Sequence, residues 1–375
     1  MRRISLIFTA KCVFMPLYIH QRDNWTNFTW NYSELSVLLG KVRNLQGRLM
    51  GKMEELGFEV RQEAELGTLT LDVLKTSEIE GEILDADQVR SSIARRLGMD
   101  LDGLVASNRD VDGIVEMMLD ATKFCNYDLT KDRLLGWHSS LFPSGRSGIY
   151  KITVGALRMG AMKVISGAMG REKIHFQAPD AQKVDSEIEK FLDWFNDEQN
   201  IDSVIKAGIA HFWFITIHPF DDGNGRIARA ITDMQLARSD GSSQRFFSMS
   251  AQIQKQRSKY YEILEKSQKG TSDITIWLDW FLACLFQALF ETNNTLEKVL
   301  SKSKFWNTQT LLNERQRLVI NKLFDGFEGK LTSSKWAKIA KCSTDTALRD
   351  IQDLIQKNIL KKEDSGGRST NYELF

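Results

Sequence analysis

The residue types needed to handle a nucleoside triphosphate occur together in one short stretch, residues 218–229, which reads HPFDDGNGRIAR. The histidine can exchange a proton near neutral pH, and a carboxylate such as Asp222 can bind a divalent cation. The glycines on both sides of Asn224 let backbone N–H groups approach an anion, and a helix that begins here turns its positively polarised N-terminus toward that anion. Arg226 and Arg229 then share one face of the helix. The stretch therefore predicts a phosphate site beside a general base.

The overall composition is that of an ordinary globular protein. The chain has 375 residues, 42% hydrophobic and 26% charged, which is enough for two or three domains with full cores. A net charge of +1 provides no general attraction for nucleic acid or for an anionic membrane. The most apolar stretch, 276–290, is interrupted by Asp279 and Gln287 and is too short to span a bilayer. We expect no membrane association.

The start of the chain and its cysteines indicate a cytoplasmic protein. A short apolar run after Arg2 and Arg3 resembles a signal peptide only weakly, because Lys11 interrupts it. We expect residues 1–22 to be a ragged start, with Met15 as an alternative initiator. The cysteines form no CxxC pair, which fits reduced thiols, and they are Cys12, Cys125, Cys284 and Cys342.

Most of the chain has helical periodicity. From Tyr32 to about Leu104, apolar residues recur at three- and four-residue spacing. This spacing predicts one long amphipathic helix, followed by a second that opens at 69–74 and ends at Gly81. Asp85 offers the N-cap of the next helix. Further helices are predicted over 110–124, 130–141, 181–196, 201–217, 226–238, 250–269 and 274–296.

Residues 163–176 depart from this pattern. They are rich in glycine and β-forming residues, and strands on both sides of 167–170 predict a β-hairpin. His175 on this hairpin is expected to be structural or exposed.

The C-terminal region has its own pattern. Lysines at 302–304 and polar residues around Asn307 predict a linker. Three helices and a terminal strand pair then predict a winged helix-turn-helix, with helices over 313–327, 332–340 and 343–358 and strands that flank 365–368.

The stretch 218–229 resembles the signature of the Fic family, HPFx[D/E]GNGRxxR, at every fixed position. The resemblance extends from about Trp25 to about Leu300. It implies an all-α, Fic-type helical core with a small β-hairpin flap, and transfer of AMP from ATP to a Ser, Thr or Tyr hydroxyl of a target protein or of the chain itself. We expect a ragged start (1–22), an N-terminal helical domain with an inhibitory motif (23–105), a catalytic core (106–300) and a winged helix-like domain (305–375).

The resemblance also implies roles for the residues of the signature. His218 is the expected general base, and Asp222 is the expected ligand of Mg²⁺, while Asp221 occupies a variable position and is expected to face solvent. The phosphates of ATP are expected to bind Gly223, Asn224, Gly225, Arg226 and Arg229, with Arg229 at the γ-phosphate.

The adenine site and an inhibitory segment are implied elsewhere in the chain. Residues 259–264 resemble the YYxxL helix of the family, in which Tyr261 and Leu264 lie near the base, whereas Gln268 stands where some relatives carry asparagine. Residues 76–81 resemble the inhibitory motif [S/T]xxxE[G/N]. This resemblance implies that Glu80 pairs with Arg229 and occupies the space of the γ-phosphate.

Partners and alternative functions remain open at this stage. A protein target is expected to dock on the hairpin 163–176 by strand addition, and a homodimer is possible. DNA binding by 305–375 is weakly supported, because acidic residues dot the presumed recognition helix. One alternative is a Fic-like core that removes AMP or transfers another phosphate-containing group, and another is a nucleotide-sensing, DNA-binding regulator.

Overall fold

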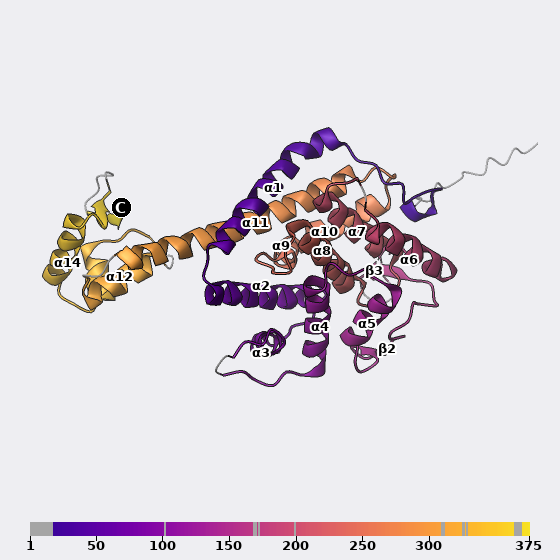
Figure 1. The fold of residues 1–375 in the computed structure, drawn as a ribbon, viewed down its shortest axis with the longest axis horizontal. Coiled ribbons are helices and arrows are strands. Elements are labelled where there is room, and N and C mark those ends of the chain that lie inside the picture. The colour runs from indigo at the N-terminus through magenta and orange to yellow at the C-terminus, as the bar shows by residue number, and fades with distance from the viewer. Residues whose placement is uncertain are drawn as a thin grey trace, which may run out of the picture. The chain divides into compact units, whose positions relative to one another are not determined.

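The structure is a computed structural model that describes residues 18–375, apart from 101–102, 168–170, 172, 199, 309–311, 325–326, 328 and 364–369. The chain divides into two compact units, Met1–Thr292 and Asn293–Phe375. Helices dominate both units (Figure 1). The helical fold class predicted from the sequence is confirmed.

Ten helices and a 3₁₀ turn precede the long helix in which the two units divide. In chain order these elements are η1 (Ile19–Gln21), α1 (Tyr32–Glu54), α2 (Phe58–Ile79), α3 (Ala86–Arg96), α4 (Arg109–Lys123), α5 (Lys131–Leu141), α6 (Ala181–Asn196), α7 (Ser203–Ile217), α8 (Asn224–Asp240), α9 (Met249–Lys255), α10 (Arg257–Gln268) and α11 (Thr275–Thr308).

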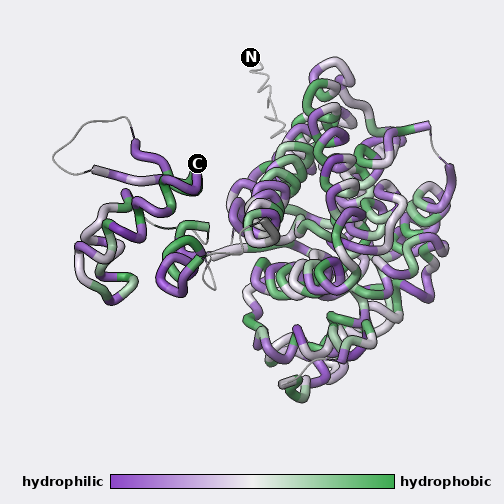
Figure 2. The backbone as a smooth tube through the Cα atoms, turned by 60° about the vertical axis from the view of Figure 1, so that its left-hand side comes forward, coloured by the Kyte–Doolittle hydropathy of each residue, from purple (hydrophilic) through white to green (hydrophobic). Residues whose placement is uncertain are grey.

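Side-chain caps explain where several of these helices begin. Asp85 accepts a hydrogen bond from the backbone N–H of Gln88, as predicted, and Asn108 and Thr130 cap α4 and α5 in the same way. The apolar stripe predicted for α1 is buried, which confirms its amphipathic character. Figure 2 shows hydrophobic and hydrophilic residues alternating along most helices, as expected where one face packs on a core.

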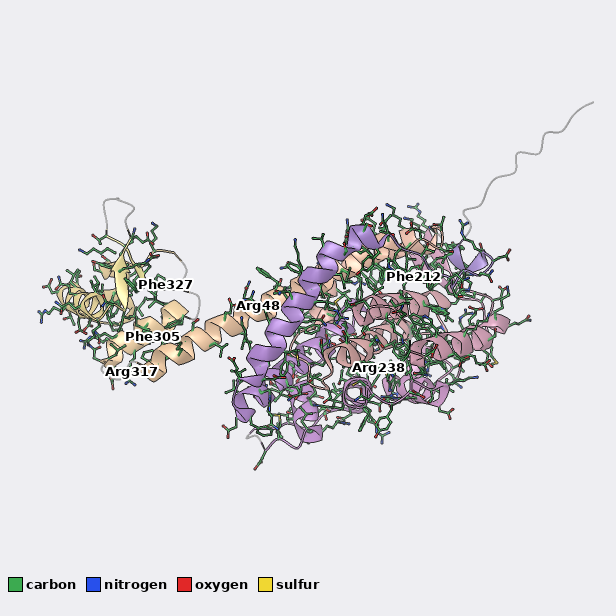
Figure 3. The ribbon with its side chains drawn as sticks, turned by 45° about the horizontal axis from the view of Figure 1, so that its top comes forward. Arg48, Phe212, Arg238, Phe305, Arg317 and Phe327 are labelled. Carbon is green, nitrogen blue, oxygen red and sulfur yellow. The ribbon has the colours of Figure 1, made fainter. Side chains whose placement is uncertain are left out.

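The core of the larger unit forms around α7, in which every residue after Ser203 is buried. Phe212 on this helix lies among the packed side chains of the unit (Figure 3). Gly208 allows α11 to approach closely, because a Cβ there would lie 2.9 Å from the Leu278 side chain. The indole Nε1 of Trp277 donates to the Gly208 carbonyl at 2.8 Å. α8 packs along α7, so the loop between the two helices is held at both ends.

Three boundaries differ from the sequence prediction. α2 begins at Phe58 rather than near Leu69. The sequence pattern missed its first turns because they are largely exposed and have no clear apolar stripe. The predicted helix 250–269 is divided at Gln256, whose φ of −116° leaves the helical range. The linker expected at 302–304 is wrong, because α11 continues to Thr308. Polar residues without proline or glycine do not end a helix.

Three antiparallel strand pairs occur among the described residues. β1 (Arg146–Ser147) pairs with β2 (Tyr150–Lys151), a pair that the sequence did not predict. β3 (Lys163–Ser166) pairs with β4 (Lys173–Gln177), which confirms the expected strands of the hairpin, and the register shifts between Val164 and Ile165. Part of the expected turn at 167–170 lies outside the described residues.

The smaller unit has its own hydrophobic core, centred on Trp336 and Ile351. Its elements after α11 are α12 (Glu314–Phe324), α13 (Ser333–Ile339), α14 (Thr344–Gln356), β5 (Leu360–Lys362) and β6 (Tyr372–Leu374). Figure 3 labels Phe305, Arg317 and Phe327 in this part of the chain.

The order of three helices and a strand pair in this unit is the expected one, while residues 365–368 lie outside the described part. Two of the acidic residues on α14 are paired within the unit: Asp350 with Arg315 at 2.8 Å and Asp353 with Lys357 at 2.7 Å. DNA contact by this unit stays a prediction. None of the described helices is both long enough and apolar enough to cross a membrane.

The close approach of α4 and α5 gives a stability prediction. A Cβ at Gly113 would lie 1.8 Å from the Ser140 carbonyl oxygen, so Gly113→Ala must push the two helices apart. We expect it to lower the free energy of unfolding by about 1–3 kcal/mol, as overpacking does. The control is Gly136→Ala in α5, where a Cβ meets nothing within 4 Å. Urea and thermal unfolding measure both variants, and an equal loss in the two would contradict the prediction.

Candidate active site

The residues predicted to do chemistry lie in the loop between α7 and α8. His218 ends α7 in a left-handed conformation (φ 53°, ψ 61°), and Pro219 cannot continue the helix. Gly223, with a φ of 79°, precedes the first residue of α8, Asn224. Since glycine has no side chain to cap the helix, the first N–H groups of α8 remain open to an anion.

His218 has a defined tautomer. Its Nδ1 lies 3.1 Å from the carbonyl oxygen of Ile215, which can only accept a hydrogen bond, so Nδ1 carries the proton and Nε2 has a free lone pair. Burial lowers the pKa of His218, and the nearby Arg158 adds to the effect, while the Ile215 carbonyl opposes it. The ring is therefore neutral at pH 7 and can accept a proton at Nε2.

Asn224 braces the loop. Its Oδ1 accepts from the backbone N–H of Phe220 at 3.0 Å, and its Nδ2 donates to the Phe220 carbonyl at 2.8 Å. The Phe220 ring stacks on His138, with ring centroids 4.2 Å apart. Burial lowers the pKa of His138 to about 4, which keeps this second histidine neutral. The amide of Asn224, which was expected to bind a phosphate of ATP, thus makes its hydrogen bonds to the backbone of the loop.

The two adjacent carboxylates have different partners. The Oδ1 of Asp222 accepts from the N–H of Gly223 at 2.6 Å, and its Oδ2 accepts from the Ser147 hydroxyl. The Oδ2 of Asp221 accepts from the N–H of Thr153 at 3.0 Å. The expectation that Asp221 faces solvent is therefore wrong, because this variable position fastens the loop to the segment after β2.

The buried Arg229 forms an ion pair with Glu80, whose side chain is 29% exposed. Its Nη2 donates to Glu80 Oε1 at 2.7 Å, and the guanidinium also donates to the hydroxyl and the carbonyl oxygen of Thr76. The Arg229 side chain is only 2% exposed. Burial disfavours its charge, but Glu80, together with Tyr260 and Tyr261, outweighs this effect, so the pKa of Arg229 is raised. The structure brings together the two residues that the resemblance paired.

Glu80 also lies against the first turn of α8. A Cβ at Gly225 would lie 2.2 Å from Glu80 Oε1, so only glycine allows the carboxylate this position. The carboxylate is thus held between the N-terminus of α8 and a buried arginine, which is where an anionic ligand would bind.

A second ion pair, which the sequence did not predict, lies beside the first. Arg226 Nη1 donates to Glu82 Oε2 at 2.6 Å, and the guanidinium carbon lies 5.0 Å from the centroid of the Phe142 ring. Gly81, with a φ of 88°, separates the two glutamates. Burial raises the pKa of Glu82, although Arg226 opposes this effect. A second acid two residues after Glu80 was the available signal.

A cavity of about 660 Å³ extends from this loop. The loop residues that reach its walls are His218, Asp221, Asp222, Asn224 and Gly225. Gly223, Arg226 and Arg229 are buried and do not line it. The other walls come from Glu80, from the pair β3–β4 and from α10, and on α10 they are Arg257, Tyr260, Tyr261, Leu264, Glu265 and Gln268.

The two tyrosines of α10 differ in their surroundings. The Tyr260 hydroxyl lies 3.0 Å from His211 Nε2 in the core, whereas Arg257 lies over the Tyr261 ring at 5.1 Å. Gln268 donates to the buried Thr216 hydroxyl at 3.3 Å. Tyr261 and Leu264, which were predicted to lie near the base, are one turn apart and both line the cavity.

The residues at the cavity wall could bind Mg²⁺ only together with a ligand that supplies further oxygen atoms. Within the described part of the chain, no group of three or more His, Cys, Asp or Glu side chains is arranged to hold a metal ion. Asp222 supplies one carboxylate at the cavity wall. Magnesium is commonly bound by one or two carboxylates together with phosphate oxygens and water, so the residues fit a magnesium–nucleotide complex rather than a closed protein site.

Comparison with known families agrees with this geometry. Residues 128–236, which include α7, the loop and most of α8, match the Fic/DOC family. The chain is a Fic-domain protein. Residues 18–99, a segment that includes Glu80 and Glu82, match a second family, described as "Domain of unknown function (DUF4172)". The family resemblance inferred from the signature is confirmed.

Several curated relatives of this Fic-domain protein are named protein adenylyltransferases. The protein of this name from Caenorhabditis elegans is 28% identical over 177 residues, which are 46% of this chain and 32% of the relative. One from Drosophila willistoni is 32% identical over 104 residues, 27% of this chain and 19% of the relative. A probable one from Aquifex aeolicus is 32% identical over 95 residues, 25% of this chain and 27% of the relative. The chain spans about a third or less of each of these relatives.

Solved structures share the fold. A Fic family protein from Desulfovibrio desulfuricans G20 has a TM-score of 0.52 at 19% identity, with 91% of this chain and 95% of that chain covered. A Fic domain-containing signalling protein from Bacteroides thetaiotaomicron has a TM-score of 0.50 at 20% identity, with 70% and 96% covered. At these identities the likeness shows the fold alone.

Proposed function

We propose that this Fic-domain protein transfers AMP from ATP to a hydroxyl side chain of a protein and is held inactive by its own residues 76–82. The observation that carries the proposal is the neutral His218, with its Nε2 free, beside the open N-terminus of α8. A base next to an anion site is what phosphoryl-group transfer requires. The names of the relatives support the same reaction.

The reaction follows from the chemistry of these groups. The acceptor oxygen attacks the α-phosphorus, the new P–O bond forms, and the bond to pyrophosphate breaks. His218 Nε2 takes the proton of the hydroxyl. N–H groups of the first turn of α8 stabilise charge on the α-phosphate, and Arg229 holds the terminal phosphate in a bidentate grip. Mg²⁺, held by Asp222 and phosphate oxygens, would neutralise charge on the polyphosphate.

The rest of the cavity suits the nucleoside and the target. Tyr261 and Leu264 provide an apolar clamp for a base. Among the described residues no third strand pairs with β3 or β4, and Ile165 and Ile174 on them are 54% and 45% exposed. An extended target segment can add to such an edge through main-chain hydrogen bonds, which positions a hydroxyl without requiring a fixed sequence.

Self-inhibition rests on competition for Arg229. The Glu80 carboxylate bonds to the guanidinium at 2.7 Å and lies against Gly225, so it takes the volume and the charge partner of the terminal phosphate. ATP that cannot engage Arg229 is free to bind with its α-phosphate turned away from attack. In this account Glu82 restrains Arg226 in the same way from a more exposed position.

The first prediction tests the reaction itself. Glu80→Gly with ATP labelled at the α-phosphate is expected to place label on protein, and ATP labelled at the γ-phosphate is expected to place none. Adding His218→Ala should lower the rate roughly 10²–10⁴-fold, as loss of a general base does, with ATP binding nearly unchanged. Transfer of the γ-label, or an unchanged rate without His218, would reject the assignment. UTP and GTP serve as alternative donors.

The second prediction concerns the coupling of Glu80 and Arg229. Glu80→Gly should activate transfer strongly when Arg229 is present and not at all in Arg229→Ala. A double-mutant cycle of the transfer rates should give a coupling of about one to a few kcal/mol. Glu80→Gln, which keeps the size, should also activate. The control is Glu78→Gly, since Glu78 contacts Lys75 and Gln254 instead. Additive effects would mean that the inhibition is steric.

The third prediction concerns Glu82. Its side chain is 46% exposed, so its ion pair with Arg226 is partly screened. Glu82→Gln should raise the transfer rate at most about fivefold, in line with the roughly 0.2–1 kcal/mol of exposed pairs. The gain should shrink at high salt. The control is Glu63→Gln, which breaks the exposed ion pair between Glu63 on α2 and Arg90 on α3 and should leave the rate unchanged.

A further inference from the structure

Three polar side chains form a hydrogen-bonded chain on the wall of the cavity. The hydroxyl Oγ of Ser166, at the end of β3, lies 2.5 Å from Nε2 of His175 on β4. The Nδ1 of His175 lies 2.5 Å from Oε2 of Glu265 on α10. All three residues line the same cavity as His218. The chain uses a histidine that the sequence suggested was structural or exposed.

The partners of Glu265 decide which nitrogen of His175 faces it with a proton. Glu265 also accepts from Lys269 Nζ at 2.6 Å. Partial burial alone would raise the pKa of Glu265, but the hydrogen bonds from Lys269 and His175 lower it, so the group is a carboxylate. A carboxylate only accepts, and therefore Nδ1 of His175 carries the proton. When Nδ1 carries the only proton of the ring, Nε2 accepts the hydroxyl proton of Ser166.

This arrangement fixes the character of the serine oxygen. Because the only proton of the Ser166 hydroxyl points at His175, the oxygen presents lone pairs alone toward the cavity. A free serine hydroxyl rotates and serves donors and acceptors alike. Here His175 and Glu265 restrict it to accepting, which is the basis for discrimination between two ligands that differ in one polar group.

The position of the chain points to the nucleobase. Glu265 follows Leu264 directly and lies one turn after Tyr261, and all three reach the cavity. In the proposed function Tyr261 and Leu264 clamp the base, so the polar edge of that base lies next to this group. His175 and Ser166 continue this group from Glu265 along the lining of the same cavity.

We propose that Ser166, oriented by His175 and Glu265, selects a nucleobase with an exocyclic amino group at the position where guanine and hypoxanthine carry a carbonyl. The amino group of adenine donates to the lone pairs of Ser166, whereas a carbonyl oxygen there meets another acceptor. This inference rests on the proposed function, because it uses the nucleotide site. Ser166 touches the base, and His175 and Glu265 are positioning residues.

The test compares ATP with ITP, which differ at this edge of the base. In the Glu80→Gly background, kcat/KM for ATP is expected to exceed that for ITP. Ser166→Ala should reduce the ratio roughly three- to tenfold, the worth of one neutral hydrogen bond, mainly by slowing ATP. Ser36→Ala on α1, where the hydroxyl bonds only the Ser33 carbonyl, is the matched control and should leave the ratio unchanged.

The positioning role is tested with two variants of His175. A glutamine at this position can donate from its amide to Glu265 and accept from Ser166, as the neutral imidazole does, so His175→Gln should retain the ratio. His175→Leu frees the serine hydroxyl to rotate and should lower the ratio as far as Ser166→Ala does. Binding of ATP and ITP, measured by calorimetry, provides a second readout that does not depend on turnover.

The outcomes separate this inference from the proposed function. Transfer from ATP with an ATP/ITP ratio that Ser166→Ala and His175→Leu leave unchanged would overturn the selection by Ser166 and leave AMP transfer standing. Absence of α-label transfer from any nucleotide would reject the proposed function, and calorimetry would then still decide whether Ser166 discriminates in binding. A loss of the ratio in His175→Gln equal to that in His175→Leu would overturn the role of the fixed proton.

Discussion

A buried arginine that must have an anion is the constraint on which this site depends. Arg229 is 2% exposed and remains charged, so removing its partner would leave an uncompensated charge in the protein interior. The chain provides Glu80 as the partner, and in the proposed function the terminal phosphate of ATP is the other candidate. Exchange of one anion for the other is thus the natural form of control here.

The contacts of α2 limit how that exchange can occur. Asp72, in the middle of the helix, accepts from the Ser248 hydroxyl and from the N–H of Ser250 at 3.2 Å, and Arg257 donates to the Ile79 carbonyl at 2.7 Å. Displacing the whole helix would break these buried bonds. Glu80 is the last residue before the left-handed Gly81, where the helix already ends. Rotation of the Glu80 side chain, with the helix in place, requires the fewest broken contacts.

The sequence predicted what depends on near neighbours and missed what depends on distant ones. The loop 218–225 was predictable because proline, glycine and two buried helices determine it within a few residues. The Glu80–Arg229 pair joins positions far apart in the chain, and only the family resemblance suggested it. Glu82 was missed and Asp221 misjudged, because no local pattern tells which carboxylate finds a partner. The chain from Ser166 to Glu265 likewise exists only after the flap meets α10.

The backbone, rather than a neighbouring carboxylate, orients His218. A non-glycine residue in the left-handed region costs roughly 1–2 kcal/mol, and such strain persists only where surrounding contacts determine it. Three contacts do so here: the N–H of His218 donates to Phe214, its Nδ1 to Ile215, and Arg158 Nε donates to its carbonyl at 2.7 Å. A carbonyl partner fixes the tautomer, and its tendency to raise the pKa of His218 is outweighed by burial. The imidazole therefore stays neutral, as a base that must accept a proton at pH 7 requires.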